Sequence, residues 1–200
     1  MNKKLLFKWS RLLHIYMSTA LFSLLIFFSV SGITLNHLDW VSSKNKPQLW
    51  QGQLPTDELQ NFAPPMSANL LAWLAKHHDL KTPSHFEWDE DANEILIDFE
   101  YPAGFAFVVV NTANGQYSID HQKGSFWQII NDLHKGRHSG TAWRWLIDIS
   151  AIFMVLFSIT GLIILWQNRP KRNTGILLTL LGTATPIVIF LFFVPSITGV

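Results

Sequence analysis

Cysteine is absent from this 200-residue chain. That absence excludes disulfides, thiolate metal sites, cysteine nucleophiles and covalent attachment of haem through a C-x-x-C-H motif. Any metal held by the chain would take its protein ligands from histidine, carboxylate, methionine or tyrosine side chains.

Charge is also scarce, since 14% of the residues are charged, 48% are hydrophobic and the mean hydropathy is +0.19. This composition is too apolar for an average soluble domain. The net charge of +1 argues against nucleic acid as a partner. No G-x-S-x-G, H-E-x-x-H, phosphate-loop or dinucleotide motif occurs, so hydrolase and nucleotide-driven functions have no residue to start from.

Three apolar runs are present, at residues 15–35, 146–166 and 176–194. A helix needs about 20 such residues to cross the hydrocarbon core of a bilayer. The first run follows a basic start, as in a secretory signal peptide, but it is longer than a signal peptide core, and Ser29 to Ile33 is a poor cleavage site. We therefore predict a retained helix, with a cleaved signal as the alternative.

The distribution of charge predicts the orientation. All 14 acidic residues fall between Asp39 and Asp148, whereas residues 1–11 and 167–175 carry lysine and arginine without any acid. Short cytoplasmic segments are enriched in Lys and Arg. The predicted order is a cytoplasmic N-terminus at 1–11, membrane helices at 12–36, 143–166 and 176–194, a periplasmic domain at 37–142, a cytoplasmic loop at 167–175 and a periplasmic C-terminus at 195–200.

The outer segment predicts a small α+β domain. Residues 44–65 are polar and proline-containing and indicate a tether, and residues 67–78 have the apolar spacing of an amphipathic helix with Ser67 as its N-cap. Strands are expected at 85–88, 95–99, 105–110 and 115–119, joined into a meander by turns at 92–93, 102–104 and 114–115. A helix is expected at 125–133.

Histidines cluster at the predicted membrane faces. Leu13-His14 precedes the first apolar run and Leu133-His134 the second, and each run ends near a small-residue pair, Ser31-Gly32 or Thr160-Gly161. Because the two helices run in opposite directions, His14 should lie near Gly161 at the inner face and His134 near Gly32 at the outer face. The small residues would allow close helix approach or leave room for a flat ligand.

These histidines raise a haem hypothesis. A b-type haem takes two axial ligands from opposite faces of the ring. His37 with His134 or His138 meets the depth requirement at the outer face. At the inner face, a haem held by His14 would need Met17, Met154, a partner chain or an open coordination site, and we expect a symmetric dimer or an added subunit there. The simpler interpretation is that all four are interfacial, capping or buried hydrogen-bonded histidines.

Two further ligand interpretations stay open. The i, i+4 spacing of His134 and His138 would place both imidazoles on one helical face, as in zinc sites, with Asp132 or His121 as a third ligand. Lys135, Arg137 and Arg144 could bind haem propionates or an anionic chelate, because arginine pairs well with carboxylates.

The chain resembles the PepSY-associated transmembrane family. The resemblance lies in Leu13-His14, Ser31-Gly32, the strand and turn at 107–115, Leu133 to Arg137, and Ser158 to Gly161 followed by Trp166. It implies a periplasmic PepSY module carried by membrane helices. Some larger relatives are haem-containing reductases of iron chelates, and small ones resemble companions of flavin-carrying extracytoplasmic redox proteins. This chain has a single module and three helices.

The sequence therefore predicts an α-helical membrane protein of the bacterial inner membrane with a periplasmic PepSY-like domain. We expect a component of an electron-transfer or iron-acquisition system, such as a subunit of an iron-chelate or flavin-linked reductase, with haem b between the first two helices. Its partners would be the lipid bilayer, a periplasmic flavin- or haem-carrying redox protein and a second copy in a homodimer. The alternative is a non-catalytic anchored module that binds or regulates a periplasmic protein.

Overall fold

The computed structural model describes residues 3–41, 46–55 and 68–195. These residues form two compact units, one of residues 26–147 and the other of residues 1–25 with 148–200. Most of the expected tether, the expected N-cap Ser67 and residues 196–200 lie outside the described residues.

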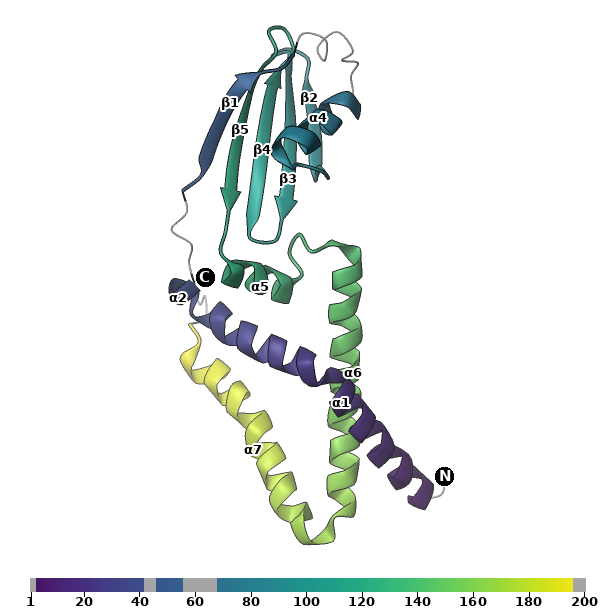
Figure 1. Cartoon of the computed structure of the whole chain (residues 1–200). Coiled ribbons are helices and arrows are strands. Elements are labelled where there is room, and N and C mark those ends of the chain that lie inside the picture. Colours follow the sequence, from purple (N-terminus) through teal and green to yellow (C-terminus); the bar gives the residue numbers. More distant parts are fainter. Residues whose placement is uncertain (1–2, 42–45, 56–67, 196–200) are drawn as a thin grey trace. The chain divides into compact units, whose positions relative to one another are not determined.

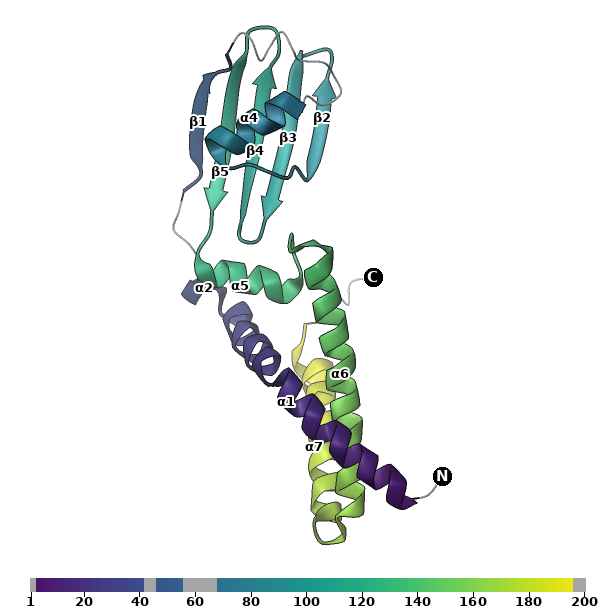
Figure 2. The ribbon, with the colours of Figure 1, turned by 45° about the vertical axis from the view of Figure 1, so that its right-hand side comes forward.

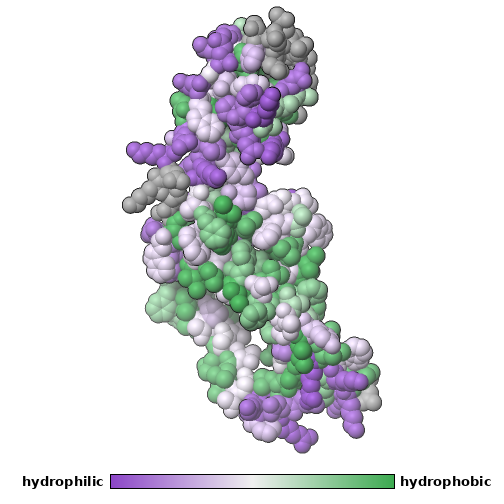
Figure 3. Space-filling model, viewed as in Figure 1, coloured by the Kyte–Doolittle hydropathy of each residue, from purple (hydrophilic) through white to green (hydrophobic). Residues whose placement is uncertain are grey.

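Three helices are long and apolar enough to cross a membrane, namely α1 (Lys3–Asn36), α6 (Gly140–Gln167) and α7 (Arg169–Phe193). Hydrophobic side chains gather over these helices in Figure 3, whereas hydrophilic ones gather over the sheet. The expectation of a helical membrane protein with an α+β domain is therefore confirmed.

The segment expected as a loop at 167–175 is helical from Arg169 onward. Its cations end the hydrophobic run, but Lys and Arg are good helix formers, so hydropathy alone misplaces the boundary. Pro170 lies in the first turn of α7. Backbone N–H groups there have no hydrogen-bond partner within the helix, so proline loses nothing by lacking one. Only Asn168 separates α6 from α7.

The domain contains one antiparallel sheet with the strand order β1-β5-β4-β3-β2. Its strands are β1 (Gln48–Gln53), β2 (His85–Asp89), β3 (Glu94–Tyr101), β4 (Gly104–Asn111) and β5 (Gln116–Lys123). The meander of the last four is as predicted, because the turns fall at the predicted breaks. The prediction of a tether was wrong for Gln48–Gln53, which pairs with β5 at the sheet edge. This strand was missed because Trp50 is its one aromatic residue that packs toward the core. The segment therefore shows little of the alternation of apolar and polar residues that indicates a strand.

Helix α4 (Ala68–His78) covers one face of the sheet (Figures 1 and 2). Alternate residues of β3 and β4 point toward it and are buried. The core holds Leu54, Leu70, Leu74, Leu80, Ile95, Ile97, Phe99, Ala106, Val108, Val110 and Ile119. Two apolar residues one helical turn apart, Leu70 and Leu74, anchor the helix on these strands.

The predicted helix at 125–133 is α5 (Phe126–Lys135). Ser125 caps its start, since its hydroxyl accepts from the Gln128 N–H while the Gln128 side chain accepts from the Ser125 N–H. Gly136 ends it with a left-handed φ of 68°, a conformation that favours glycine. The Asp132 carboxylate accepts from the Ala103 N–H at 2.8 Å, so α5 is fixed to the turn between β3 and β4.

Two histidines stack on Trp50 on the helix-covered side of the sheet. The ring centroids of His78 and His121 lie 5.5 and 4.9 Å from that of Trp50. Burial lowers the pKa of His78, and the neighbouring His77 lowers it further. Burial also lowers the pKa of His121, an effect that Lys123 adds to and Asp120 opposes. The folded domain therefore favours both rings in their neutral form.

This preference predicts a domain that loses stability in acid. Unfolded histidines bind protons near pH 6.5, above the pKa values of these two in the folded state. Their contribution is full above pH 6.5 and declines as the pH falls below it toward the folded values. Hydrogen exchange of the β3–β5 amides in the full chain should accelerate between pH 7.5 and 5 after correction for intrinsic rates.

The double variant His78→Gln with His121→Gln should flatten this pH dependence, whereas His85→Gln, at an exposed position of β2, should preserve it. An unchanged pH dependence in the double variant would contradict the assignment to these two rings.

Candidate functional site

His134, in the last turn of α5, is bound to α1. Its Nδ1 lies 2.6 Å from the hydroxyl of Ser31, a residue with no exposed surface. The ring also meets Phe28 edge-on, with centroids 5.2 Å apart. The indole of Trp143 donates to the Leu133 carbonyl at 2.8 Å and so holds the end of α5 against the start of α6.

The hydrogen bonds of the Ser31 hydroxyl are consistent with one tautomer of His134. The hydroxyl oxygen lies 2.6 Å from the Phe27 carbonyl of the same helix and 2.6 Å from Nδ1 of His134. When the single hydroxyl proton is donated to the Phe27 carbonyl, the hydroxyl accepts from His134 and Nδ1 carries the proton. Burial, with a smaller effect of Lys135, lowers the pKa of His134 and favours the neutral ring. A neutral ring protonated at Nδ1 has its free lone pair on Nε2.

His14 makes the equivalent contact with α6. Its Nδ1 lies 3.1 Å from both the Phe157 carbonyl and the Thr160 hydroxyl, and the Thr160 hydroxyl itself donates to Phe157. A carbonyl only accepts hydrogen bonds, so Nδ1 of His14 also carries a proton. The imidazole stacks on Phe157, with centroids 4.2 Å apart and an interplanar angle of 13°. We call these two contacts the His134–Ser31 clasp and the His14–Thr160 clasp.

Glycine makes room for each clasp. A Cβ atom at Gly161 would lie 3.2 Å from Cε1 of His14, and one at Gly32 would lie 3.7 Å from Cε1 of His134. The predicted pairs, His14 with Gly161 and His134 with Gly32, are confirmed. The small residues were expected either to allow close helix approach or to leave room for a flat ligand. In the structure, the ring of the histidine itself occupies the space beside each glycine.

The other two candidate histidines have separate surroundings. His37 lies just beyond α1 and stacks on Trp40, with ring centroids 3.9 Å apart. His138 has a φ of 50°, and its Nδ1 lies 3.0 Å from Glu100. The i, i+4 spacing had suggested that His134 and His138 share a helical face. They do not, because α5 ends at Lys135. Among the described residues no group of three or more His, Asp or Glu could hold a metal ion.

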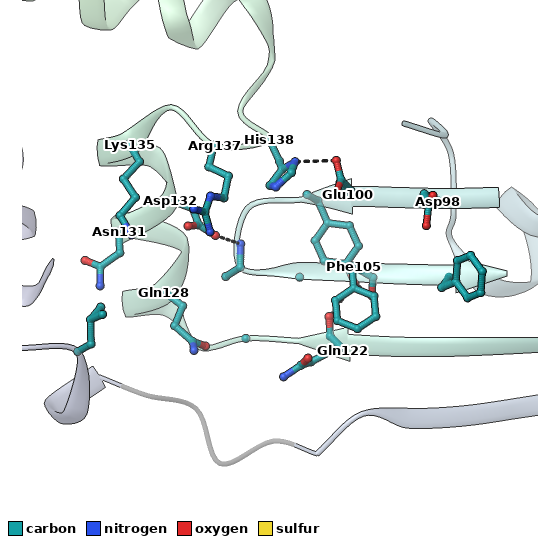
Figure 4. Close-up of a pocket in the computed structure, with 16 residues that line it drawn as sticks. Asp98, Glu100, Phe105, Gln122, Gln128, Asn131, Asp132, Lys135, Arg137 and His138 are labelled. Carbon is teal, nitrogen blue, oxygen red and sulfur yellow. Dashed lines mark hydrogen bonds and ion pairs between the residues drawn. The ribbon is translucent and has the colours of Figure 1, made fainter. Parts of the chain in front are cut away.

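A hollow of about 570 Å³ lies in the domain between α5 and the strand ends (Figure 4). We call it the α5 pocket; it is lined by Leu38, Asp98, Glu100, Tyr101, Ala103, Gly104, Phe105, Phe107, Gln122, Gly124, Gln128, Asn131, Asp132, Lys135, Arg137 and His138. Phe105 and Phe107 alternate with the buried Ala106 and Val108, so they point to the sheet face opposite α4.

Asn131 is the most buried polar residue of the α5 pocket, with 3% of its surface exposed. Its Oδ1 lies 2.6 Å from the Thr34 hydroxyl, whereas its Nδ2 has no hydrogen-bond partner among the described residues. Lys135 and Arg137 line the same side, and Asp98 and Glu100 lie on β3 across the pocket. Both signs of charge therefore face one concave surface.

The sequence alone did not identify this pocket as a site. Lys135 and Arg137 were considered for anionic ligands, but Asn131 and Phe105 were not considered. One signal in the sequence could have indicated the pocket. Phe105 and Phe107 of β4 point away from the core, and two large apolar side chains on an outer sheet face indicate an interaction site.

Taken together, these features define a membrane protein that carries one small α+β domain on its helices. The family model described as putative PepSY_TM-like matches residues 8–195, so the chain belongs to this family. No curated protein and no solved structure matches the chain.

The glycine contacts yield a paired prediction. Gly161→Leu should displace His14 and destabilise the full chain in detergent by about 1–3 kcal/mol, the usual cost of overpacking. Gly182→Leu, on α7 where nothing lies within 4 Å of a Cβ atom, should not lower the midpoint of thermal unfolding. Equal losses of thermal stability in both variants would contradict the role given to Gly161.

Proposed function

We propose that this chain is an inner-membrane PepSY component of an extracytoplasmic electron-transfer or iron-acquisition system, and that it binds b-type haem through its clasped histidines. The domain would lie in the periplasm and the basic ends of the helices in the cytoplasm, in accordance with the placement of Lys and Arg. The proposal rests on the hydrogen bonding of the imidazoles.

The main support is that His134 and His14 each commit Nδ1 to the protein. Histidines that bind a metal commonly donate one ring N–H to a neighbouring acceptor, which orients the other nitrogen as the ligand. The hydrogen bonds that join these two rings to the neighbouring helices are all made by Nδ1, so Nε2 is the nitrogen proposed as the ligand. The donor chemistry therefore fits His134 and His14 as residues that would each hold haem iron through Nε2.

A second residue would complete the set that holds the haem at each site. His138 is a candidate at the outer face, because Glu100 takes its Nδ1 and leaves Nε2 available. His37 is the other candidate there. His14 would receive its counterpart from a second copy of the chain or from another subunit. Bound haem would supply single-electron transfer, and Lys135 and Arg137 are the nearby cations suited to its propionates.

The test is an absorption spectrum of the full chain in mild detergent, oxidised and dithionite-reduced, after expression with sufficient haem. We expect the sharp reduced bands of a six-coordinate b-type haem. His134→Ala should remove most of the outer-face signal, whereas His85→Ala, at an exposed position of β2, should retain it. A colourless but folded protein, or equal spectra in both variants, would contradict haem binding at the clasp.

A second candidate function, recognition of a periplasmic partner protein, is favoured by the sheet. Helix α4 covers the opposite face of the sheet, whereas the face that carries Phe105 and Phe107 also presents Asp98 and Glu100 (Figures 1 and 2). Aromatic residues ringed by charges are typical of protein interfaces. The haem and partner functions are compatible, since a redox protein docked here would be the electron partner.

Site-specific photocross-linking tests this second function in intact cells. A photoreactive phenylalanine analogue at Phe107 should capture a discrete periplasmic protein, whereas the same analogue at Lys76, exposed on α4, should not. Capture from Lys76 alone, or from neither position, would argue against recognition by this face.

A further inference from the structure

The first turns of α1 place three cations in a row. Lys4, Lys8 and Arg11 follow the i, i+4, i+7 spacing, so they share one face of the helix, and Ile15 continues that face. Residues 1–11 contain no acid. This face therefore changes along its length from cationic to apolar.

These residues line a hollow of about 350 Å³ together with Phe7, Leu12 and Gln167. Gln167 is the last residue of α6, and its Oε1 accepts a hydrogen bond of 2.5 Å from the Arg11 guanidinium. That bond holds Arg11 at the wall of the hollow and uses only one of its five N–H donors. The remaining donors are available to an anion.

A tryptophan marks the depth of this hollow in a bilayer. Trp166 precedes Gln167, is 62% exposed and lies beneath the Arg172 guanidinium, with 5.4 Å between the guanidinium carbon and the ring centroid. Tryptophan side chains favour the level of the lipid headgroups. Leu12 and Ile15 follow Arg11 along α1 and lead into its apolar run.

We propose that this hollow binds an anionic phospholipid, with its phosphate at Lys4, Lys8 and Arg11 and an acyl chain along Leu12 and Ile15. Lysine and arginine suit phosphate oxygens through charge-assisted hydrogen bonds. A free phosphate ion shares that chemistry, but it would make no use of the apolar continuation. The gradient along the helix face therefore favours the lipid over the ion.

The experiment measures binding of fluorescent phosphatidylglycerol to the full chain in uncharged detergent micelles. The double variant Lys8→Gln with Arg11→Gln removes two cations from the hollow. Its matched control, Lys3→Gln with Lys171→Gln, removes two exposed cations that do not line the hollow. Hydrogen exchange of the domain serves to check that each variant is folded.

We expect the hollow variant to bind the lipid at least about tenfold more weakly and the control to change less than about twofold. Phosphatidylcholine should bind no better to the original chain than to the hollow variant. Equal weakening in both double variants would overturn the proposal in favour of diffuse attraction by a basic surface. Displacement of the lipid by millimolar inorganic phosphate would overturn it in favour of a free anion.

Discussion

The structure depends on the need of polar side chains in apolar helices to find partners. Helices that cross a bilayer form the hydrogen bonds of their backbone groups internally. A hydroxyl or imidazole on their surface cannot hydrogen-bond to water there and needs a partner in the protein. Ser31 and Thr160 each hydrogen-bond to a carbonyl of their own helix and to a histidine of another helix. Glycine follows each hydroxyl residue, because the ring needs the space that a side chain would fill.

Each of these two histidine hydrogen bonds has two consequences. It joins two helices, α5 to α1 at Ser31 and α1 to α6 at Thr160. It also commits one ring nitrogen and leaves the other as a base, so a structural contact and a ligand position coincide in the same imidazole. Within the domain, Trp143 and Asp132 hold α5 from either side, and the α5 pocket is assembled around the helix that carries His134.

The sequence predicts much of this arrangement, because its strongest signals are local or repeated. The apolar runs, the alternating β3 and β4, and the cap formed by Ser125 and Gln128 identify their elements directly. The pairing of His14 with Gly161 and of His134 with Gly32 followed from two similar motifs on antiparallel helices. The β1 strand was missed because its pairing with β5 lies far away in the sequence. The α5 pocket was missed because its lining comes from strands and a helix that only the tertiary fold brings together, and His138 was misplaced because Gly136 ends the helix.

Nitrogen-15 NMR of histidine-labelled protein in detergent tests the central claim most directly. The two nitrogens of a neutral imidazole have distinct chemical shifts, so the protonated one can be identified for His14 and His134. The clasps require the proton on Nδ1 in both rings, and Ser31→Ala should change the shifts of His134 while those of His14 stay the same. A proton on Nε2 in either ring at neutral pH would contradict the clasp and, with it, the axial position proposed for that nitrogen.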